Sequence, residues 1–99
     1  MTLPLSVYMI TLNNGSTIEK ALASVAGWAS EVVVVDSEST DGAKEIIGRY
    51  TDRCYQLMTS DMAEKYGYAQ SLCTSPWVLF IDADEWLTPE IKAEIEEVL

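Results

Sequence analysis

Two carboxylates separated by one residue, Asp82 and Asp84, directly follow the apolar run at 77–81. If the chain stays extended beyond that run, alternate side chains project to the same side, so both carboxylates could share one cation or one diol. Hard cations such as Mg²⁺ and Mn²⁺ prefer a few carboxylates together with diphosphate oxygens. The spacing therefore predicts a site for a divalent metal and a phosphorylated ligand. The plainer interpretation stays open, in which both acids only solvate a loop before the last helix.

A third acid, Asp36, ends a run of four valines and begins a polar segment at 36–42. A carboxylate at the end of a strand can accept a hydrogen bond from the imide N–H of a pyrimidine base or from a ribose hydroxyl. The alternative is a turn or helix-capping acid. For Asp41 we prefer that structural role, because Gly42 follows it and permits an unusual backbone angle.

These acids must be positioned by strands and helices that the hydrophobic pattern predicts. Apolar runs predict strands at 5–12, 31–36, 54–57 and 77–81, and helical spacing of apolar residues predicts helices at 16–26, 43–50, 61–73 and 88–99. Ser16 with Glu19, and Asp61 with Glu64, have the spacing of helix-capping boxes. Thr88 before a proline is expected to cap the last helix.

Strands that alternate with helices predict an α/β fold of the Rossmann-like type, with three layers and a mostly parallel four-stranded sheet. A chain of 99 residues fits one domain, at 1–99. Ligands of such sheets bind beyond the carboxyl ends of the strands, where the strand order reverses. The residues expected to carry function are therefore those at 12–14, 36–41 and 82–85.

Composition excludes several classes of function. Sixteen acidic and six basic residues give a net charge of −10, which would repel the phosphate backbone of a nucleic acid. No apolar run approaches the roughly 20 residues of a membrane span. The first residues lack the basic flank and cleavage site of a signal peptide, so we expect a cytoplasmic protein. The sequence has neither the glycine fingerprint of a dinucleotide-binding fold nor a P-loop.

The cysteines and tryptophans are assigned to structure rather than chemistry. Cys54 and Cys73 lack metal-ligand spacing, and the chain contains no histidine, so we expect two buried thiols and no zinc site. Trp28 and Trp77 are expected in the core.

The segments VVVDSESTDG and WVLFIDADEWLTPE, in this order and after these strands, resemble family 2 glycosyltransferases, especially the bacterial lipopolysaccharide-core subgroup. The resemblance extends over essentially the whole chain and implies the nucleotide-binding half of a GT-A fold. It implies that Asp36 contacts the base, usually uracil, with Leu12 beside it. It further implies that Asp82 faces the ribose or sugar and that Asp84 binds Mn²⁺ or Mg²⁺. The implied activity is inverting transfer of a sugar from a nucleotide-sugar, UDP-linked in most cases, to a glycan or lipid-linked acceptor.

Three positions affect how far the residue roles of the family can be assigned to this chain. Asn14 stands where the first motif of the family usually has an acid, and Glu38 stands where the second usually has glycine. Lys65 is a candidate for the basic residue that often helps to hold the nucleotide. The acceptor half and its catalytic base are expected to be absent from 1–99, and the last helix reaches the chain end without a C-cap, as in a truncated domain.

Two other functions remain as alternatives. One is a non-catalytic module that binds a sugar nucleotide or associates with itself; the surface left by a missing half-domain predicts a homo-oligomer. The other is a phosphohydrolase of the haloacid-dehalogenase type, which also places two aspartates at this spacing after an apolar strand.

Overall fold

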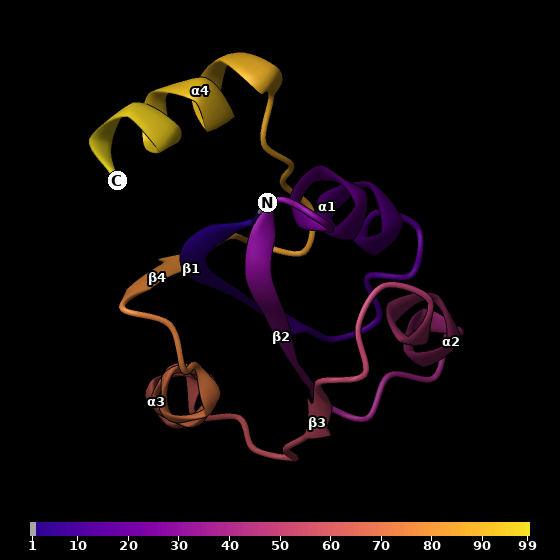
Figure 1. Ribbon diagram of the computed structural model, residues 1–99. Coiled ribbons are helices and arrows are strands. Elements are labelled where there is room, and N and C mark those ends of the chain that lie inside the picture. Colours follow the sequence, from indigo (N-terminus) through magenta and orange to yellow (C-terminus); the bar gives the residue numbers. More distant parts are fainter. Residues whose placement is uncertain (1) are drawn as a thin grey trace.

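The computed structural model describes residues 2–99 and contains eight elements in strict alternation (Figure 1). The strands are β1 (Leu3–Thr11), β2 (Ala29–Asp36), β3 (Cys54–Gln56) and β4 (Trp77–Phe80). The helices are α1 (Ile18–Val25), α2 (Ala43–Gly48), α3 (Met62–Leu72) and α4 (Pro89–Val98). Every predicted element is present, with bounds that differ from the predicted ones by a few residues.

The four strands form one sheet in the order β3-β2-β1-β4, and all three pairs are parallel. The predicted three-layer α/β fold is confirmed. The order reverses at β1, which pairs with β2 on one side and with β4 on the other. The carboxyl ends of β1 and β4 therefore flank the point where ligands bind in sheets of this kind.

The core has one layer on each face of the sheet. On one face, Val7 and Val34 pack with the helices α1 and α2, including Leu22 and Ile47. On the other face, Tyr8, Val33 and Val35 pack against Ala69 of α3. The four consecutive valines of β2 are buried because the strand is central and both of its faces are covered. None of the helices within residues 2–99 is both long and apolar enough to cross a membrane.

The helix starts confirm two predicted caps and correct a third. The carboxylate of Asp61 accepts from the backbone N–H of Ala63 at 2.9 Å, and the Thr88 hydroxyl accepts from that of Ile91 at 3.2 Å. The prediction that Ser16 caps α1 is wrong. Thr17 occupies the cap position, but its hydroxyl donates to the carbonyls of Asn14 and Ala83 and accepts from none of the N–H groups of the helix. The carbonyl of Asn14 accepts from the backbone N–H groups of Thr17 and Ile18 at the first turn.

Trp77 and the two cysteines are more exposed than predicted, whereas Trp28 packs against the core as predicted. Trp77 is 53% exposed, because β4 is an edge strand with no partner on its outer side in the described chain. Trp28 is half-buried against the core. Cys54 and Cys73 are both half-buried free thiols, since one lies on the edge strand β3 and the other at the end of α3.

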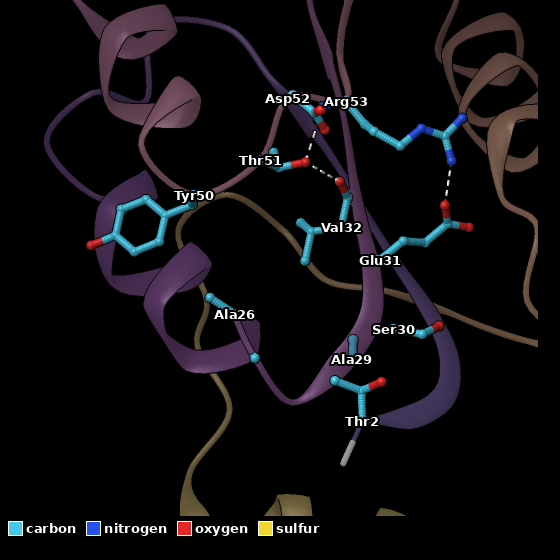
Figure 2. Close-up of a pocket in the computed structure, with 11 residues that line it drawn as sticks. Thr2, Ala26, Ala29, Ser30, Glu31, Val32, Tyr50, Thr51, Asp52 and Arg53 are labelled. Carbon is cyan, nitrogen blue, oxygen red and sulfur yellow. Dashed lines mark hydrogen bonds and ion pairs between the residues drawn. The ribbon is translucent and has the colours of Figure 1, made fainter.

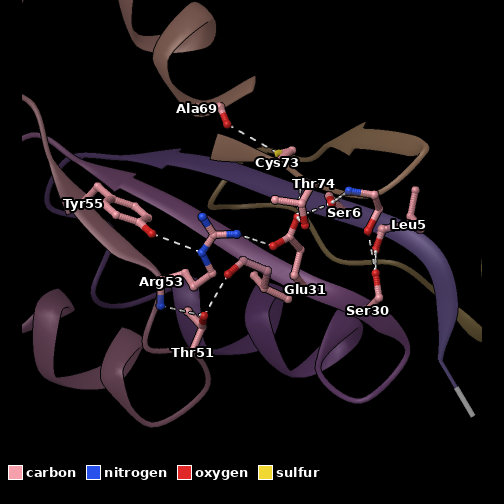
Figure 3. Close-up of polar contacts among 12 residues, drawn as sticks. Leu5, Ser6, Ser30, Glu31, Thr51, Arg53, Tyr55, Ala69, Cys73 and Thr74 are labelled. Atoms are coloured by element: carbon pink, nitrogen blue, oxygen red, sulfur yellow. Dashed lines mark hydrogen bonds and ion pairs between the residues drawn. The ribbon is translucent and has the colours of Figure 1, made fainter. Parts of the chain in front are cut away.

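A polar cluster around Glu31 joins four segments at the amino edge of the sheet (Figure 3). The Glu31 carboxylate accepts from Ser6 of β1, from Arg53 before β3, and from both the N–H and the hydroxyl of Thr74 before β4. Partial burial alone would raise the pKa of Glu31, but the bonds from Ser6, Thr74 and Arg53 outweigh it and lower that pKa to about 2. Glu31 thus holds the segment that enters the short strand β4.

Candidate functional site

The candidate site lies at the carboxyl edge of the sheet, where the loops after β1 and β2 are bonded to each other. The strand register places Thr11 opposite Asp36 and Asp36 opposite Gln56, so three strands end at the same level. Asn13 donates its backbone N–H to the hydroxyl of Ser39 at 2.9 Å and accepts from the N–H of Thr40 at 2.8 Å. These bonds fix the two loops relative to each other.

The side chain of Asn14 is used within its own loop. Its Oδ1 accepts from the hydroxyl of Thr11 at 2.9 Å and from the backbone N–H of Leu12 at 3.0 Å. The turn that results leaves the side chain of Leu12 52% exposed. An apolar side chain is thereby held at the end of β1, next to the loop that follows β2.

Asp36 is completely buried, and its carboxylate is engaged inside the loop that it begins. Its oxygens accept from the backbone N–H of Ser39 at 3.1 Å and from the Ser39 hydroxyl. Asp41 accepts from the N–H of Gly15 at 2.8 Å and from that of Ala43 at 3.1 Å. The structural role predicted for Asp41 is confirmed, and Gly42 has the positive φ, 89°, that the sequence suggested.

A cavity of about 530 Å³ opens at this edge, between the ends of β1, β2 and β3 and the start of α3. Its walls come from Leu12, Ser37, Glu38, Met58, Thr59, Ser60 and Lys65. Two of these residues were named from the sequence as ligand-binding candidates, Leu12 and Lys65. Ser37 and Glu38 fall within the segment 36–41 that was expected to carry function, although no ligand-binding role was predicted for Ser37 itself. Met58 lies outside every segment expected to carry function, and no sequence signal pointed to it.

Glu38 has a φ of 56°, in the left-handed region that favours glycine. Its backbone N–H donates to the side-chain oxygen of Gln56 at 3.1 Å, and its carboxylate pairs with Lys44 at 3.2 Å. The backbone therefore adopts at Glu38 a conformation natural for the glycine that the motif usually has there. Compared with glycine, Glu38 therefore adds a side chain to the wall of the cavity but leaves the backbone path of the turn unchanged.

Asp82 and Asp84 lie on the neighbouring loop, after β4. The chain does not stay extended here, because the N–H of Glu85 donates to the carbonyl of Asp82 at 3.0 Å and closes a turn, so the condition for two carboxylates on the same side is not met. Both aspartates are nevertheless exposed, since Ile81 and Ala83 are the buried residues of the segment. The carbonyl of Ala83 accepts from Thr17 at 3.1 Å, which ties this loop to the one after β1.

The acids of this loop influence each other. Partial burial, the neighbouring Glu85 carboxyl and the charge of Asp84 all raise the pKa of Asp82. Among residues 2–99 the structure gathers no group of three or more potential metal ligands. Sites for Mg²⁺ in proteins commonly combine one or two carboxylates with substrate phosphates, and Asp82 and Asp84 are two exposed carboxylates on one loop.

A second cavity, of about 510 Å³, lies at the opposite edge, beside the start of β2 and residues 50–53 (Figure 2). Its polar groups bond to each other: Thr51 donates to the carbonyl of Val32 at 2.8 Å, and Arg53 pairs with Glu31. None of the residues predicted to bind metal or nucleotide lines it. The carboxyl-edge cavity is therefore the candidate site.

Comparison with known proteins matches residues 6–97 to the sequence profile of the family described as glycosyl transferase family 2. The chain belongs to this family. An uncharacterised glycosyltransferase of Rickettsia conorii is 37% identical over 99% of this chain and 35% of its own length. The lipopolysaccharide core biosynthesis glycosyltransferase LpsC of Rhizobium meliloti is 33% identical over 98% of this chain and 37% of its own length.

Solved structures confirm the GT-A fold of this family 2 chain. TarS of S. aureus (residues 1–349), crystallised in complex with UDP, superposes with a TM-score of 0.80 and 25% identity, over 97% of this chain and 31% of TarS. Glucosyl-3-phosphoglycerate synthase of Mycobacterium tuberculosis shares the fold, with a TM-score of 0.71 over 82% of this chain and 34% of its own. The chain spans about a third of the length of the curated relatives it matches. Membership of family 2 also decides against the phosphohydrolase alternative.

Proposed function

We propose that residues 1–99 form the donor-binding half of an inverting glycosyltransferase, which holds the nucleotide of a nucleotide-sugar at the carboxyl edge of the sheet. The observation that carries the proposal is a cavity at the carboxyl edge of the sheet, walled by residues that follow β1, β2 and β3, on the same edge at which the Asp82–Asp84 loop follows β4. The likeness to TarS, solved with UDP, supports a uracil nucleotide. The likeness to LpsC supports a glycan or lipid-linked acceptor for the whole enzyme.

The proposed roles follow from the positions of the side chains. Leu12, exposed at the mouth of the cavity, packs on the base. Asp36 acts on the base side by holding the loop at 37–41 through Ser39. Asp82 faces the ribose or sugar. We assign no catalytic base within these residues, and place it with the acceptor site in the part of the enzyme that corresponds to the other two-thirds of the relatives.

Asp84, with Asp82 beside it, would hold a Mn²⁺ or Mg²⁺ ion. The fit is adequate, because such ions are bound in many nucleotide sites by one or two carboxylates plus substrate phosphates, and both carboxylates are exposed here. When bound, the ion supplies Lewis-acid stabilisation of the departing diphosphate. Its positive charge would also reduce the repulsion between the phosphates of the nucleotide and a protein of net charge −10.

The test is calorimetric titration of the protein with UDP, CDP and GDP, in the presence and absence of Mn²⁺. We expect UDP to bind at least about ten-fold more tightly with Mn²⁺ than without it, because the ion alone bridges carboxylates and phosphates. Equal affinity for UDP in both conditions would contradict the metal assignment. Failure of all three nucleotides to bind would sink the proposal as a whole.

We also propose that the isolated chain forms homodimers through the outer edge of β4. Trp77 and Val78 are exposed on a strand that, within residues 2–99, pairs with β1 alone, and Figure 1 shows β4 at the rim of the sheet. Exposed apolar edges of this kind associate. Sedimentation equilibrium at tens of micromolar should report a dimer, and Trp77→Lys should shift it to monomer. A monomeric wild-type protein would refute the dimer.

A further inference from the structure

The hydroxyl of Ser37 is buried in the candidate site without a hydrogen-bond partner. Within residues 2–99 it is the sole buried side-chain oxygen or nitrogen atom in this situation, and the residue is 2% exposed. Folded proteins rarely leave such a group unpaired, because it gives up its bonds to water and receives nothing in return. Ser37 lines the cavity of about 530 Å³, so a bound molecule could supply the missing partner.

Its neighbour Asp36 is in the opposite state. Both sides of the Asp36 carboxylate are used, by the N–H and by the hydroxyl of Ser39, and no part of the residue reaches the surface. Asp36 is also not among the residues that line the cavity, whereas Ser37 is, so a ligand in the cavity would meet Ser37 first. The hydrogen-bonding group available at the end of β2 is thus Ser37, one residue later.

The remaining walls indicate the shape and polarity of the ligand. Leu12 and Met58 are 52% and 74% exposed and provide apolar surface for a flat ring. Lys65 lines the same cavity with only 7% of its surface exposed, and none of the ion pairs within residues 2–99 involves it. An ammonium group only donates hydrogen bonds, whereas a hydroxyl donates or accepts. The cavity therefore suits a planar ring that carries carbonyl oxygens next to an N–H group.

Resting on the proposed function, we propose that Ser37 reads the polar edge of the nucleobase, in the role predicted for Asp36, and that Lys65 donates to a carbonyl of the same ring. Uracil presents an N–H between two carbonyl oxygens, which matches an accepting hydroxyl beside a donating ammonium. Cytosine presents an amino group in place of one carbonyl, and two donors then face each other. Ser37 and Lys65 together favour uracil over cytosine for this reason.

Ser37→Ala tests the inference with two readouts that move in opposite directions. Without ligand, the variant should melt at a higher temperature than the wild type, because an unpaired buried hydroxyl has been removed. Its affinity for UDP in Mn²⁺ should fall by about three- to ten-fold, the range of one neutral hydrogen bond. Ser71→Ala is the matched control: it removes an exposed hydroxyl of α3 that bonds only to the carbonyl of Tyr68, and should leave UDP affinity unchanged.

Two further measurements distinguish the loss of a contact with the base from a change in the folded structure of the Ser37→Ala variant. The wild-type protein should bind N3-methyl-UDP more weakly than UDP, because the methyl group replaces the N–H that Ser37 accepts. Lys65→Met should reduce the preference for UDP over CDP. Wild-type affinity for UDP in Ser37→Ala, or equal binding of UDP and its N3-methyl derivative, would overturn the role of Ser37 while leaving the proposed nucleotide site intact. If the wild type bound no nucleotide, the proposed function itself would fail, and this inference with it.

Discussion

Asp84→Asn is expected to lower the affinity of the protein for UDP in Mn²⁺ by about 100-fold, which corresponds to roughly 3 kcal/mol. The physical reason is that Asp84 is the proposed link between the ion and the protein. A hydrogen bond that involves a charged group contributes about 1.5–3 kcal/mol, and we take the same range for the ligand bond of Asp84. The neutral amide oxygen of asparagine binds a hard cation more weakly than the charged carboxylate does. The exposed turn that holds Asp84 is closed by backbone groups and by Glu85, so the substitution should leave the fold unchanged.

Calorimetry with a matched charge control separates this effect from a general change in electrostatics. Glu97→Gln alters the net charge by the same amount on an exposed site of α4, and should bind UDP as the wild type does. Asp82→Asn should show a smaller loss, since Asp82 is proposed to face the ribose or sugar instead of the ion. If Asp84→Asn retained Mn²⁺-dependent binding within about three-fold of the wild type, the ion would not be held by Asp84.

The second large effect is expected at the amino edge of the sheet, far from the site. Glu31→Gln should lower the free energy of unfolding at pH 7 by about 2–3 kcal/mol. The amide loses the charge that pairs with Arg53, and its N–H₂ group must face either the Arg53 guanidinium or the donors of Ser6 and Thr74. In either orientation a donor faces a donor, so at least one of the groups that Glu31 joins loses its hydrogen-bond acceptor.

The pKa of Glu31 gives this prediction a pH signature. Folding lowers that pKa from its ordinary value of 4.5 to about 2, so the folded state binds fewer protons than the unfolded state in this range. The corresponding stability is fully present above about pH 4.5 and is lost as the pH falls toward 2. At 1.36 kcal/mol per pKa unit, the stability that the ionised Glu31 contributes has an upper limit of about 3 kcal/mol. The side chain is 13% exposed, and contact with solvent lowers the contribution below that limit.

Urea denaturation of the wild type and of Glu31→Gln at pH 7 and pH 3 is the measurement. The difference in the free energy of unfolding between the wild type and Glu31→Gln should be large at pH 7 and smaller at pH 3. Glu19→Gln is the control, because Glu19 makes an exposed pair with Arg49 at 3.9 Å that is worth little in water. Surface substitutions usually change the free energy of unfolding by no more than about 0.5 kcal/mol. If Glu31→Gln changed it at pH 7 by no more than this, the prediction would be contradicted.

The agreement between the predicted and observed elements has a local cause. The four valines of β2, the cap residues Asp61 and Thr88, and the glycine at 42 act through their own backbone and near neighbours, so a pattern in the sequence predicts them. Parallel strands joined by helices then leave few topologies to choose among. The motifs after β2 and β4 indicated the family for the same reason: each is a continuous segment with a fixed place after a strand.

The errors concern residues whose surroundings come from elsewhere in the chain. Trp77 was expected in the core because it is large and apolar, but no element of the described chain covers the outer edge of β4. Ser16 has the spacing of a cap, yet the carbonyl of Asn14 already serves the first turn of α1. Neither outcome follows from the residues at those positions.

The sequence by itself determined the alternation of strands and helices, the family, and the acids at 36, 82 and 84 as candidates. The tertiary structure decided what each candidate is free to do. Asp36 is occupied by Ser39, whereas the hydroxyl of Ser37 is left without a partner in a cavity shared with Leu12 and Lys65. The turn at 82–85 points two carboxylates toward solvent. Hydrogen bonds and burial between distant segments set these differences, since a residue type fixes the groups it carries and only its neighbours in space fix which of them remain available.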